Sequence, residues 1–383
     1  MSTPHHSTGP SADAYLPAVT GLRGVAALWV LLFHLYDLAH RIDISLGPID
    51  PALWLTSGYL GVDLFFVLSG FLLAPVFIDP ARRAAGLWPF WRNRLRRVLP
   101  ALWVQLLILL AIAAIWGGGL PPWEEIATHF TLTFNLWRNE SPINGVYWSL
   151  PIEWNFYMVL PLMALAFAGG ARRALFGVLL YLLLAIGFRL LCVWAVQRHG
   201  ADGVVLTRWI TQLPGRLDQF AFGMAAAWWL LRYPPAPILA RTLAWLGLLA
   251  ALALAALASE LGSFVGQLRM PWVWLFNALI ALAFASLVLG AAADPRGAVA
   301  RGLQWRPLAW LGMVSYSLYL WHAPLLHGFA QWAQRAAGPW DLLWLTVASL
   351  VLAWLSYRFV ERPFLGARAR RAERRPALAD GSG

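Results

Sequence analysis

The feature that most constrains this chain is a series of long apolar segments, each near the length of a membrane-spanning helix. A bilayer core needs roughly 20 apolar residues per helix, and windows of about 19 residues predict about ten spans. They lie near residues 17–39, 55–78, 98–117, 146–168, 174–196, 214–231, 238–258, 272–292, 307–326 and 341–360. Hydrophobic residues make up 60% of the chain, above the ~45–50% of soluble domains. The predicted fold class is an all-α polytopic membrane protein.

One membrane domain is expected, because no long polar linker divides the spans. It covers residues 17–363, between a disordered tail at 1–16 and a basic, disordered tail at 364–383. Residues 1–16 contain no Lys or Arg, and no A-x-A signal follows the first apolar run, so that run is expected to remain as a span. The single cysteine, Cys192, is interpreted as a buried small residue, and no metal is expected.

The arginines predict how the chain is oriented. All 29 basic residues are arginines, and they cluster in alternate loops, after the second, fourth, sixth, eighth and tenth spans. The positive-inside rule makes these loops cytoplasmic, so both termini are expected on the cytoplasmic side of the inner (cell) membrane. The net charge of +11 then reflects topology, and basic residues sorted between short loops do not predict a nucleic-acid partner.

Several ionisable residues lie inside the apolar segments, where each costs free energy unless it has a partner, water or a ligand. Arg23 is expected in the inner half of the first span, and His34 lies about 16 Å further along the same helix. Five residues are expected at one height in the outer half, namely His34, His322, Asp63, Glu153 and Asp218. We expect them to converge on one polar cavity.

Structural interpretations of two of these residues stay open. Asp218 could form an ion pair with Arg216, two residues away in PGRLDQF. His322 could bond a backbone carbonyl that Pro324 leaves free. Arg189 is an intramembrane charge to which the sequence assigns no role.

The stretch WPFWRNRLRRVLP, residues 88–100, is expected to be a cytoplasmic loop with four arginines in six positions. Such a cluster can be a topology signal alone. Guanidinium groups also bind phosphate through paired, charge-assisted hydrogen bonds. Together with Arg23 they would line a mouth for a polyphosphate ligand such as a nucleotide-like acyl carrier. Without lysine or a G-x-x-x-x-G-K loop, the chain is not expected to hydrolyse ATP.

An ordered set of motifs resembles the acyltransferase 3 family of integral membrane acyltransferases, which includes O-antigen acetylases. The motifs are TGLRGVAALWVLLFH, GVDLFFVLSGFLL, FWRNRLRRVLP, WSLPIEWNFY, GRLDQFAFGM, GMVSYSLYLWHAP and the terminal VERP. Arg23 and His34 match the family's R-x10-H pair, whose histidine the resemblance implies is essential. By the same resemblance, Arg94 and Arg97 match an R-x-x-R donor-binding pair. It implies acyl transfer from cytoplasmic acyl-CoA, with acetyl-CoA as the expected co-substrate, to a hydroxyl commonly on a glycan.

The chemistry of acyl transfer suggests roles for the polar residues. A thioester is already activated, so the protein must align a hydroxyl, remove its proton and stabilise the oxyanion. Imidazole suits proton removal, which makes His34 the expected general base, with Glu153 or Asp63 orienting it or the acceptor. A covalent acyl-histidine intermediate stays open. The other expected substrate- or donor-binding residues are Arg216, Asp218, Tyr316, His322 and Trp148. No permanently bound cofactor is expected.

Two further questions stay open in the sequence. The aromatic residues Trp148, Trp154, Phe156 and Tyr157 could stack on a sugar or form an interfacial belt. Intramembrane charges and proline-broken spans also occur in transporters, so a permease for a lipid-linked or small glycan is the alternative function. The expected partners are the lipid bilayer, acyl-CoA and a carbohydrate or glycoside acceptor, with the oligomeric state undetermined.

Overall fold

A computed structural model describes residues 16–42, 44, 50–84, 86–116, 119–137, 143–199, 203–260 and 273–365. These residues form helices and no strand, which confirms the all-α class. The tails expected at 1–16 and 364–383 lie almost entirely outside the described residues. The long helices are α1 (Pro17–Leu38), α3 (Leu60–Leu73), α6 (Leu87–Ile115), α9 (Leu150–Met163), α10 (Ala171–His199), α12 (Leu217–Arg232), α13 (Pro237–Glu260), α15 (Val273–Ala293), α17 (Arg306–Ala333) and α18 (Pro339–Ser356).

Short segments connect these helices. They are α2 (Ala52–Leu55), α4 (Pro75–Ile78), α5 (Pro80–Arg83), α7 (Trp123–Phe130), α8 (Phe134–Trp137), η1 (Gly145–Ser149), η2 (Ala164–Phe167), α11 (Gly203–Ile210), η3 (Leu213–Arg216), α16 (Ala298–Leu303), η4 (Tyr357–Glu361) and α19 (Arg362–Phe364). The segment η4 is π-helical, a conformation that is rare and often found at functional sites.

Each of the ten expected spans corresponds to a long helix. In the described part of the chain, eight helical segments are long and apolar enough to cross a membrane. The other two expected spans are α12, which has only 16 residues, and α17, whose 28 residues include several serines, tyrosines and histidines. The chain is therefore a multi-pass membrane protein.

The stretch at 88–100 is not a loop as expected. It forms the first half of α6, which continues through Pro100 to Ile115. Arginine is a good helix former, and the arginine-rich stretch therefore extends the apolar span instead of interrupting it. In this helix Arg94 and Arg97 are three positions apart and lie on one face. Both are half-buried, whereas Arg92 and Arg96 are exposed.

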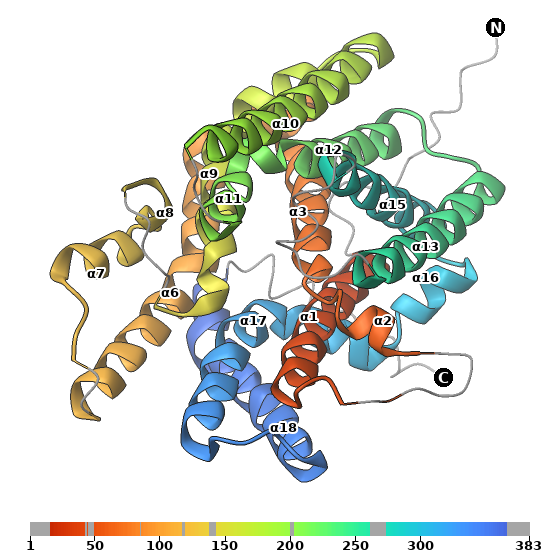
Figure 1. Ribbon diagram of the computed structural model, residues 1–383. Helices are drawn as coiled ribbons and strands as arrows, with labels where there is room; N and C mark the ends of the chain where they lie inside the picture. Colours follow the sequence, from red (N-terminus) through yellow and green to blue (C-terminus); the bar gives the residue numbers. More distant parts are fainter. Residues whose placement is uncertain are drawn as a thin grey trace, which may run out of the picture.

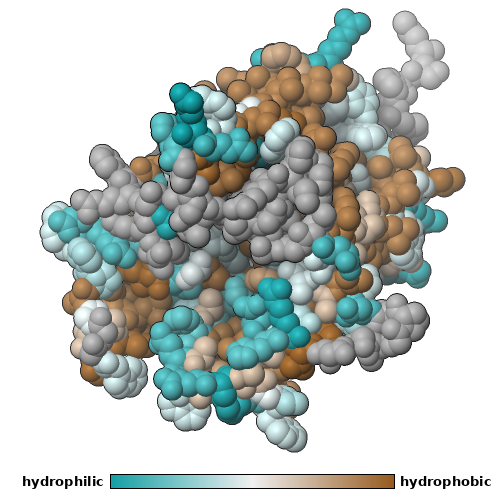
Figure 2. Space-filling model, viewed as in Figure 1, coloured by the Kyte–Doolittle hydropathy of each residue, from teal (hydrophilic) through white to brown (hydrophobic). Residues whose placement is uncertain are grey.

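Helices α1, α3, α12, α15 and α17 occupy the interior of the bundle (Figure 1). α1 packs along α17, and α3 contacts α1, α12 and α15. α10 and α13 lie at the periphery, where hydrophobic side chains cover the surface (Figure 2). Only 22% of the α10 span is buried, compared with 78% of the α15 span, so the outer helices are the ones that face lipid.

Glycines bring α1 and α17 into backbone contact. A Cβ atom on Gly312 of α17 would overlap the carbonyl oxygen of Thr20 in α1, and one on Gly24 would overlap that of Leu308. Small residues at such contacts let membrane helices approach closely. The contact fixes the relative position of the two helices that carry His34 and His322.

Candidate active site

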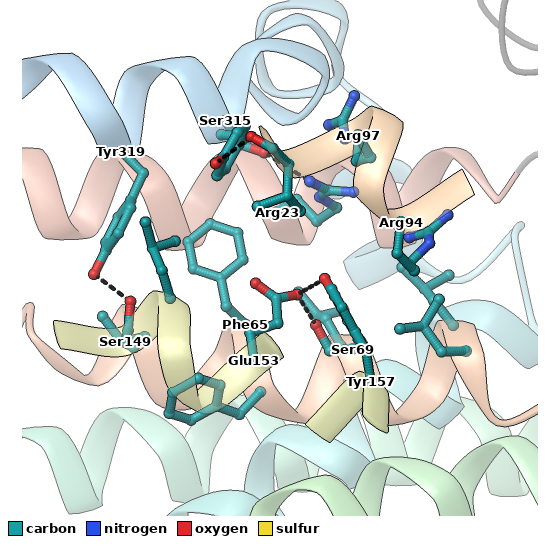
Figure 3. Close-up of a pocket in the computed structure, with 18 residues that line it drawn as sticks. Arg23, Phe65, Ser69, Arg94, Arg97, Ser149, Glu153, Tyr157, Ser315 and Tyr319 are labelled. Atoms are coloured by element: carbon teal, nitrogen blue, oxygen red, sulfur yellow. Dashed lines mark hydrogen bonds between the residues drawn. The ribbon is translucent and has the colours of Figure 1, made fainter. Parts of the chain in front are cut away.

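A cavity of about 100 Å³ lies between α1, α3, α6, α9 and α17 (Figure 3). Side chains from distant parts of the sequence meet there, with guanidinium groups at one end and the Ser149–Tyr319 pair at the other. The polar residues lining it are Arg23, Ser69, Arg94, Arg97, Ser149, Glu153, Tyr157, Ser315, Tyr316 and Tyr319. Its apolar wall includes Val62, Phe65, Phe66, Leu68 and Leu150. The cavity is therefore strongly basic at one end and has a largely apolar wall.

Two of the arginines in this cavity have little internal compensation. Arg23 donates one hydrogen bond, of 3.2 Å, from Nη2 to Ser315 Oγ. Arg94 makes no hydrogen bond or ion pair within the described part of the chain, and the Nε atoms of both arginines are buried without a partner. A buried cation that lacks a protein partner is costly. These groups are therefore suited to an anionic ligand.

Arg97 is instead held by an acid that sequence reasoning missed. Its Nη1 lies 3.2 Å from Oε2 of Glu361, at the end of η4. Glu361 is 1% exposed and also accepts a hydrogen bond from the hydroxyl of Ser317. The sequence did contain a signal for this role, because Glu361 is an acid in the motif VERP, directly after an apolar segment. The C-terminal π-helical segment thus fixes the direction of a cavity arginine.

Glu153 lies in the middle of the cavity (Figure 3). Its Oε1 accepts hydrogen bonds from Tyr157, at 2.6 Å, and Ser69, at 2.8 Å. Its Oε2 makes no hydrogen bond to any described residue. From the sequence, Glu153 was expected at the height of Asp63. Glu153 comes eight residues after the start of its span at Gly145, whereas Asp63 comes three residues after the start of its span at Leu60. Glu153 therefore lies deeper in the bundle, level with Ser69.

Asp63 does not line the cavity. Its Oδ1 accepts a 2.6 Å hydrogen bond from Arg216 Nη1 and another from Gln219 Nε2, and its side chain is 5% exposed. The contacts of Asp63 therefore do not support its expected role in orienting the base or the acceptor, because its charge is already paired inside the bundle.

The ion pair that Asp218 could form with Arg216 is not present. Residues two apart on a helix do not face each other, and the two side chains point to different neighbours. Asp218 receives two hydrogen bonds from Arg189 of α10, at 2.7 and 2.8 Å, while Arg216 pairs with Asp63. Arg216 also lies 6.0 Å from the ring centre of Trp148. Arg189, Arg216 and Asp218 therefore belong to a buried ionic cluster beside the cavity.

His34 and His322 form a pair of their own, with ring centroids 5.0 Å apart. Neither lines the cavity, so the expected convergence of both histidines and all three acids on one space is wrong. Tyr319 connects the histidine pair to the cavity. Its ring centroid lies 6.0 Å from that of His322, and its hydroxyl is 2.7 Å from Ser149 Oγ at the cavity end. The histidine pair therefore lies just beyond the cavity.

His322 does not cap the carbonyl that Pro324 leaves free. That carbonyl belongs to Leu320, four residues earlier, and it accepts hydrogen bonds from Gln105, at 2.6 Å, and Asn144, at 3.0 Å. His322 instead contacts the carbonyl of Leu318. The structural role expected for His322 is thus filled by two amide side chains.

The aromatic residues divide between the cavity and the protein core. Tyr316 lines the cavity, and its hydroxyl donates a 2.9 Å hydrogen bond to the Val98 carbonyl. Phe156 stacks on Phe220 with ring centroids 3.9 Å apart, so it is a packing residue. Of the four candidates for sugar stacking, only Tyr157 lines the cavity.

A family model described as an acyltransferase domain, that of acyltransferase 3, matches residues 16–358. The peptidoglycan O-acetyltransferase OatA of Listeria monocytogenes is 24% identical over 369 residues, 91% of this chain and 56% of that protein. The O-acetyltransferase OatA of Staphylococcus aureus is 27% identical over 374 residues, 91% of this chain and 57% of that protein.

The putative peptidoglycan O-acetyltransferase YrhL of Bacillus subtilis is 26% identical over 371 residues, 91% of this chain and 55% of that protein. This chain thus spans little more than half the length of these relatives. No solved structure gives a significant match. Because the family model covers nearly all of the helical bundle, including α1, α3, α6, α9 and α17 around the cavity, the chain belongs to the acyltransferase 3 family of integral membrane proteins.

Proposed function

We propose that this protein is a membrane O-acyltransferase that moves an acetyl group from acetyl-CoA to a hydroxyl of a cell-envelope glycan. The observation that carries the proposal is a cavity with unpaired guanidinium groups at one end and a histidine pair just beyond the other. The names of the relatives support acetyl as the group and a peptidoglycan-like acceptor. The phosphates of the donor would bind Arg23, Arg94 and Arg97 through charge-assisted hydrogen bonds.

The geometry of α1 supports this arrangement of the donor. Arg23 and His34 lie on one continuous helix, Pro17–Leu38, and eleven residues of helix rise about 16 Å. An extended pantetheine arm has a comparable length. With its phosphates at the arginines, its thioester would reach the end of the cavity next to the histidines. Glu153 Oε2 would accept an amide N–H of the arm, which gives this carboxylate a positioning role.

His34 has the form that a general base requires. Its Nδ1 is 2.8 Å from the Val30 carbonyl, and because a carbonyl only accepts, Nδ1 carries the proton and the lone pair is on Nε2. His34 Nε2 takes the proton of the acceptor hydroxyl while the oxygen attacks the thioester carbon. The carbon–sulfur bond then breaks, and the thiolate receives a proton. Direct transfer is proposed, without an acyl-histidine intermediate.

The arginine distribution supports one orientation of the bundle. We place the arginine end of the cavity and both termini on the cytoplasmic side, where acyl-CoA is made, and His34 towards the outer side. A single cysteine at Asn93, in a variant whose own Cys192 is replaced by Ala, tests this placement. An impermeant thiol reagent added to intact cells should leave it unlabelled, and labelling would contradict the orientation.

The test of the activity uses the purified full chain in detergent. An acyltransferase consumes acetyl-CoA when a glycan acceptor is added, and the acetyl group appears on the acceptor by mass spectrometry. A permease would give no transfer in detergent and would instead move glycan in sealed vesicles. Transport without acetyl-CoA consumption would therefore replace the proposal by the alternative function.

A further inference from the structure

The two histidines beyond the cavity share one tautomer. His322 Nδ1 lies 2.9 Å from the carbonyl of Leu318, just as His34 Nδ1 faces the carbonyl of Val30. Each carbonyl belongs to the residue four positions earlier in the same helix, and each can only accept. Both neutral imidazoles therefore carry hydrogen on Nδ1 and a lone pair on Nε2.

Their Nε2 atoms differ in surroundings. His322 is 1% exposed, and its Nε2 is buried without a partner. His34 is half-buried, and its Nε2 makes no hydrogen bond within the described residues. Leaving a buried acceptor unpaired is costly. The unpaired Nε2 of His322 would therefore be stabilised by a hydrogen-bond donor, which the pair of neutral imidazoles does not supply.

One added proton supplies that donor. Two lone pairs cannot bond to each other, but an imidazolium Nε2–H can donate to a neutral Nε2. An N–H···N bond of about 2.9 Å between two imidazoles places their ring centroids roughly 5 Å apart. The observed separation is 5.0 Å, with the ring planes at 63°. The rings are therefore close enough for their Nε2 atoms to approach each other and share one proton.

We propose that His34 and His322 take up one proton as a pair, so that His322 is a positioning residue that stabilises the protonated base. The inference rests on the proposed function. The hydroxyl proton moves to His34 Nε2 as the new oxygen–carbon bond forms, and the resulting N–H is accepted by His322 Nε2. When the carbon–sulfur bond breaks, the proton passes to the thiolate and both imidazoles return to their neutral forms. His322 does not touch the substrate.

Three other titratable groups lie near the pair. Asp37, on α1, is exposed and lies 3.1 Å from Arg41 Nε. Tyr319, on α17, donates its hydroxyl to the Val146 carbonyl. Tyr59, before α3, has its ring centroid 6.0 Å from that of Phe33, whose own ring lies 4.9 Å from that of His34. The two imidazoles are thus the groups placed to exchange a proton.

Two substitutions of His322 separate the role of Nε2 from that of packing. An Asn amide reaches the position of Nδ1 and keeps the bond to Leu318, but it leaves nothing at Nε2. A Gln amide reaches the position of Nε2, where its oxygen can accept the proton-bearing nitrogen of His34. His327→Gln is the matched control, since His327 is exposed on the same helix. All variants are made in the full chain.

The first readout does not require catalysis. Diethyl pyrocarbonate attacks unprotonated imidazole, so mass spectrometry of labelled His34 across a pH series gives the midpoint of its protonation. In His322→Asn we expect that midpoint to fall by about one to two pH units, the equivalent of one charge-assisted hydrogen bond. His322→Gln should return it towards the parent value, and His327→Gln should leave it unchanged.

The second readout is acetyl transfer. His322→Asn should lower kcat about tenfold or more with the KM for acetyl-CoA unchanged, and His322→Gln should recover part of the loss. An unchanged midpoint in His322→Asn, or equal losses in the Asn and Gln variants, would overturn the shared proton. Absence of transfer by the parent protein would instead refute the proposed function, while the labelling midpoint would still decide the inference.

Discussion

Arg189 and Asp218 form a two-pronged ion pair across α10 and α12, with hydrogen bonds of 2.7 and 2.8 Å. The remaining nitrogens of Arg189 donate to the carbonyls of Gly215, at 2.9 Å, and Trp274, at 2.8 Å. All three nitrogens are therefore used inside the protein. This pair ties three parts of the bundle together and leaves no charge for a ligand.

Replacing Arg189 by Met should strongly destabilise the protein. The substitution leaves the Asp218 carboxylate buried and unpaired, which typically costs about 3–5 kcal/mol. The double variant Arg189→Met with Asp218→Leu removes both charges and should recover at least half of the loss. Unfolding of the purified proteins in detergent measures both. A single variant as stable as the parent would show that the pair is not a structural element.

Asp63 and Glu153 should respond differently to loss of charge. Asp63→Asn leaves Arg216 unpaired in the interior, so we expect lower stability but normal acetyl transfer per folded molecule. Glu153→Gln should fold normally and raise the KM for acetyl-CoA, because the amide is a weaker acceptor for the pantetheine arm. Kinetics and unfolding are measured on the same preparations. The reverse pattern would make Asp63 the functional acid.

The guanidinium groups of α6 should contribute to donor affinity according to the face on which they lie. Arg94→Ala and Arg97→Ala are expected to weaken acetyl-CoA binding by about 1–3 kcal/mol each. Glu361→Gln should weaken binding as well, since Arg97 loses the acid that fixes its direction. Arg92, exposed on the same helix, is the control. Acetyl-CoA affinity is measured by calorimetric titration. Equal losses of affinity in Arg92→Ala and Arg94→Ala would show that these arginines act only as a topology signal.

The glycine contact between α1 and α17 should be sensitive to a single methyl group. Gly312→Ala forces a Cβ into the Thr20 carbonyl, so the helices must separate and the histidines move apart; we expect lower stability and less transfer. Gly328→Ala, on the same helix with nothing within 4 Å of the added carbon, should be neutral or slightly stabilising. Equal behaviour of the two variants in unfolding assays would contradict the close contact.

Apart from the loop expected at 88–100, the sequence predicted the long helices correctly, and it also predicted the basic end of the cavity, because apolar length and arginine spacing are properties of single segments. It failed on the partners of the acids. Depth along a helix fixes one coordinate, whereas contact depends also on how each helix is rotated and which helices are neighbours. Arg216 and Asp218 therefore pair with Asp63 and Arg189, residues of other helices. The role of Glu361 was missed for the same reason.

The most direct test of the account is to measure donor binding and acetyl transfer on one purified variant, His34→Ala. Removal of a general base typically lowers the rate by ~10²–10⁴-fold, while acetyl-CoA should bind as tightly as to the parent, because in the proposed arrangement its phosphates would lie about 16 Å away at Arg23. Arg23→Ala is the matched control and should weaken donor binding. Substantial transfer by folded His34→Ala protein would contradict the account and direct the search for the base to Glu153.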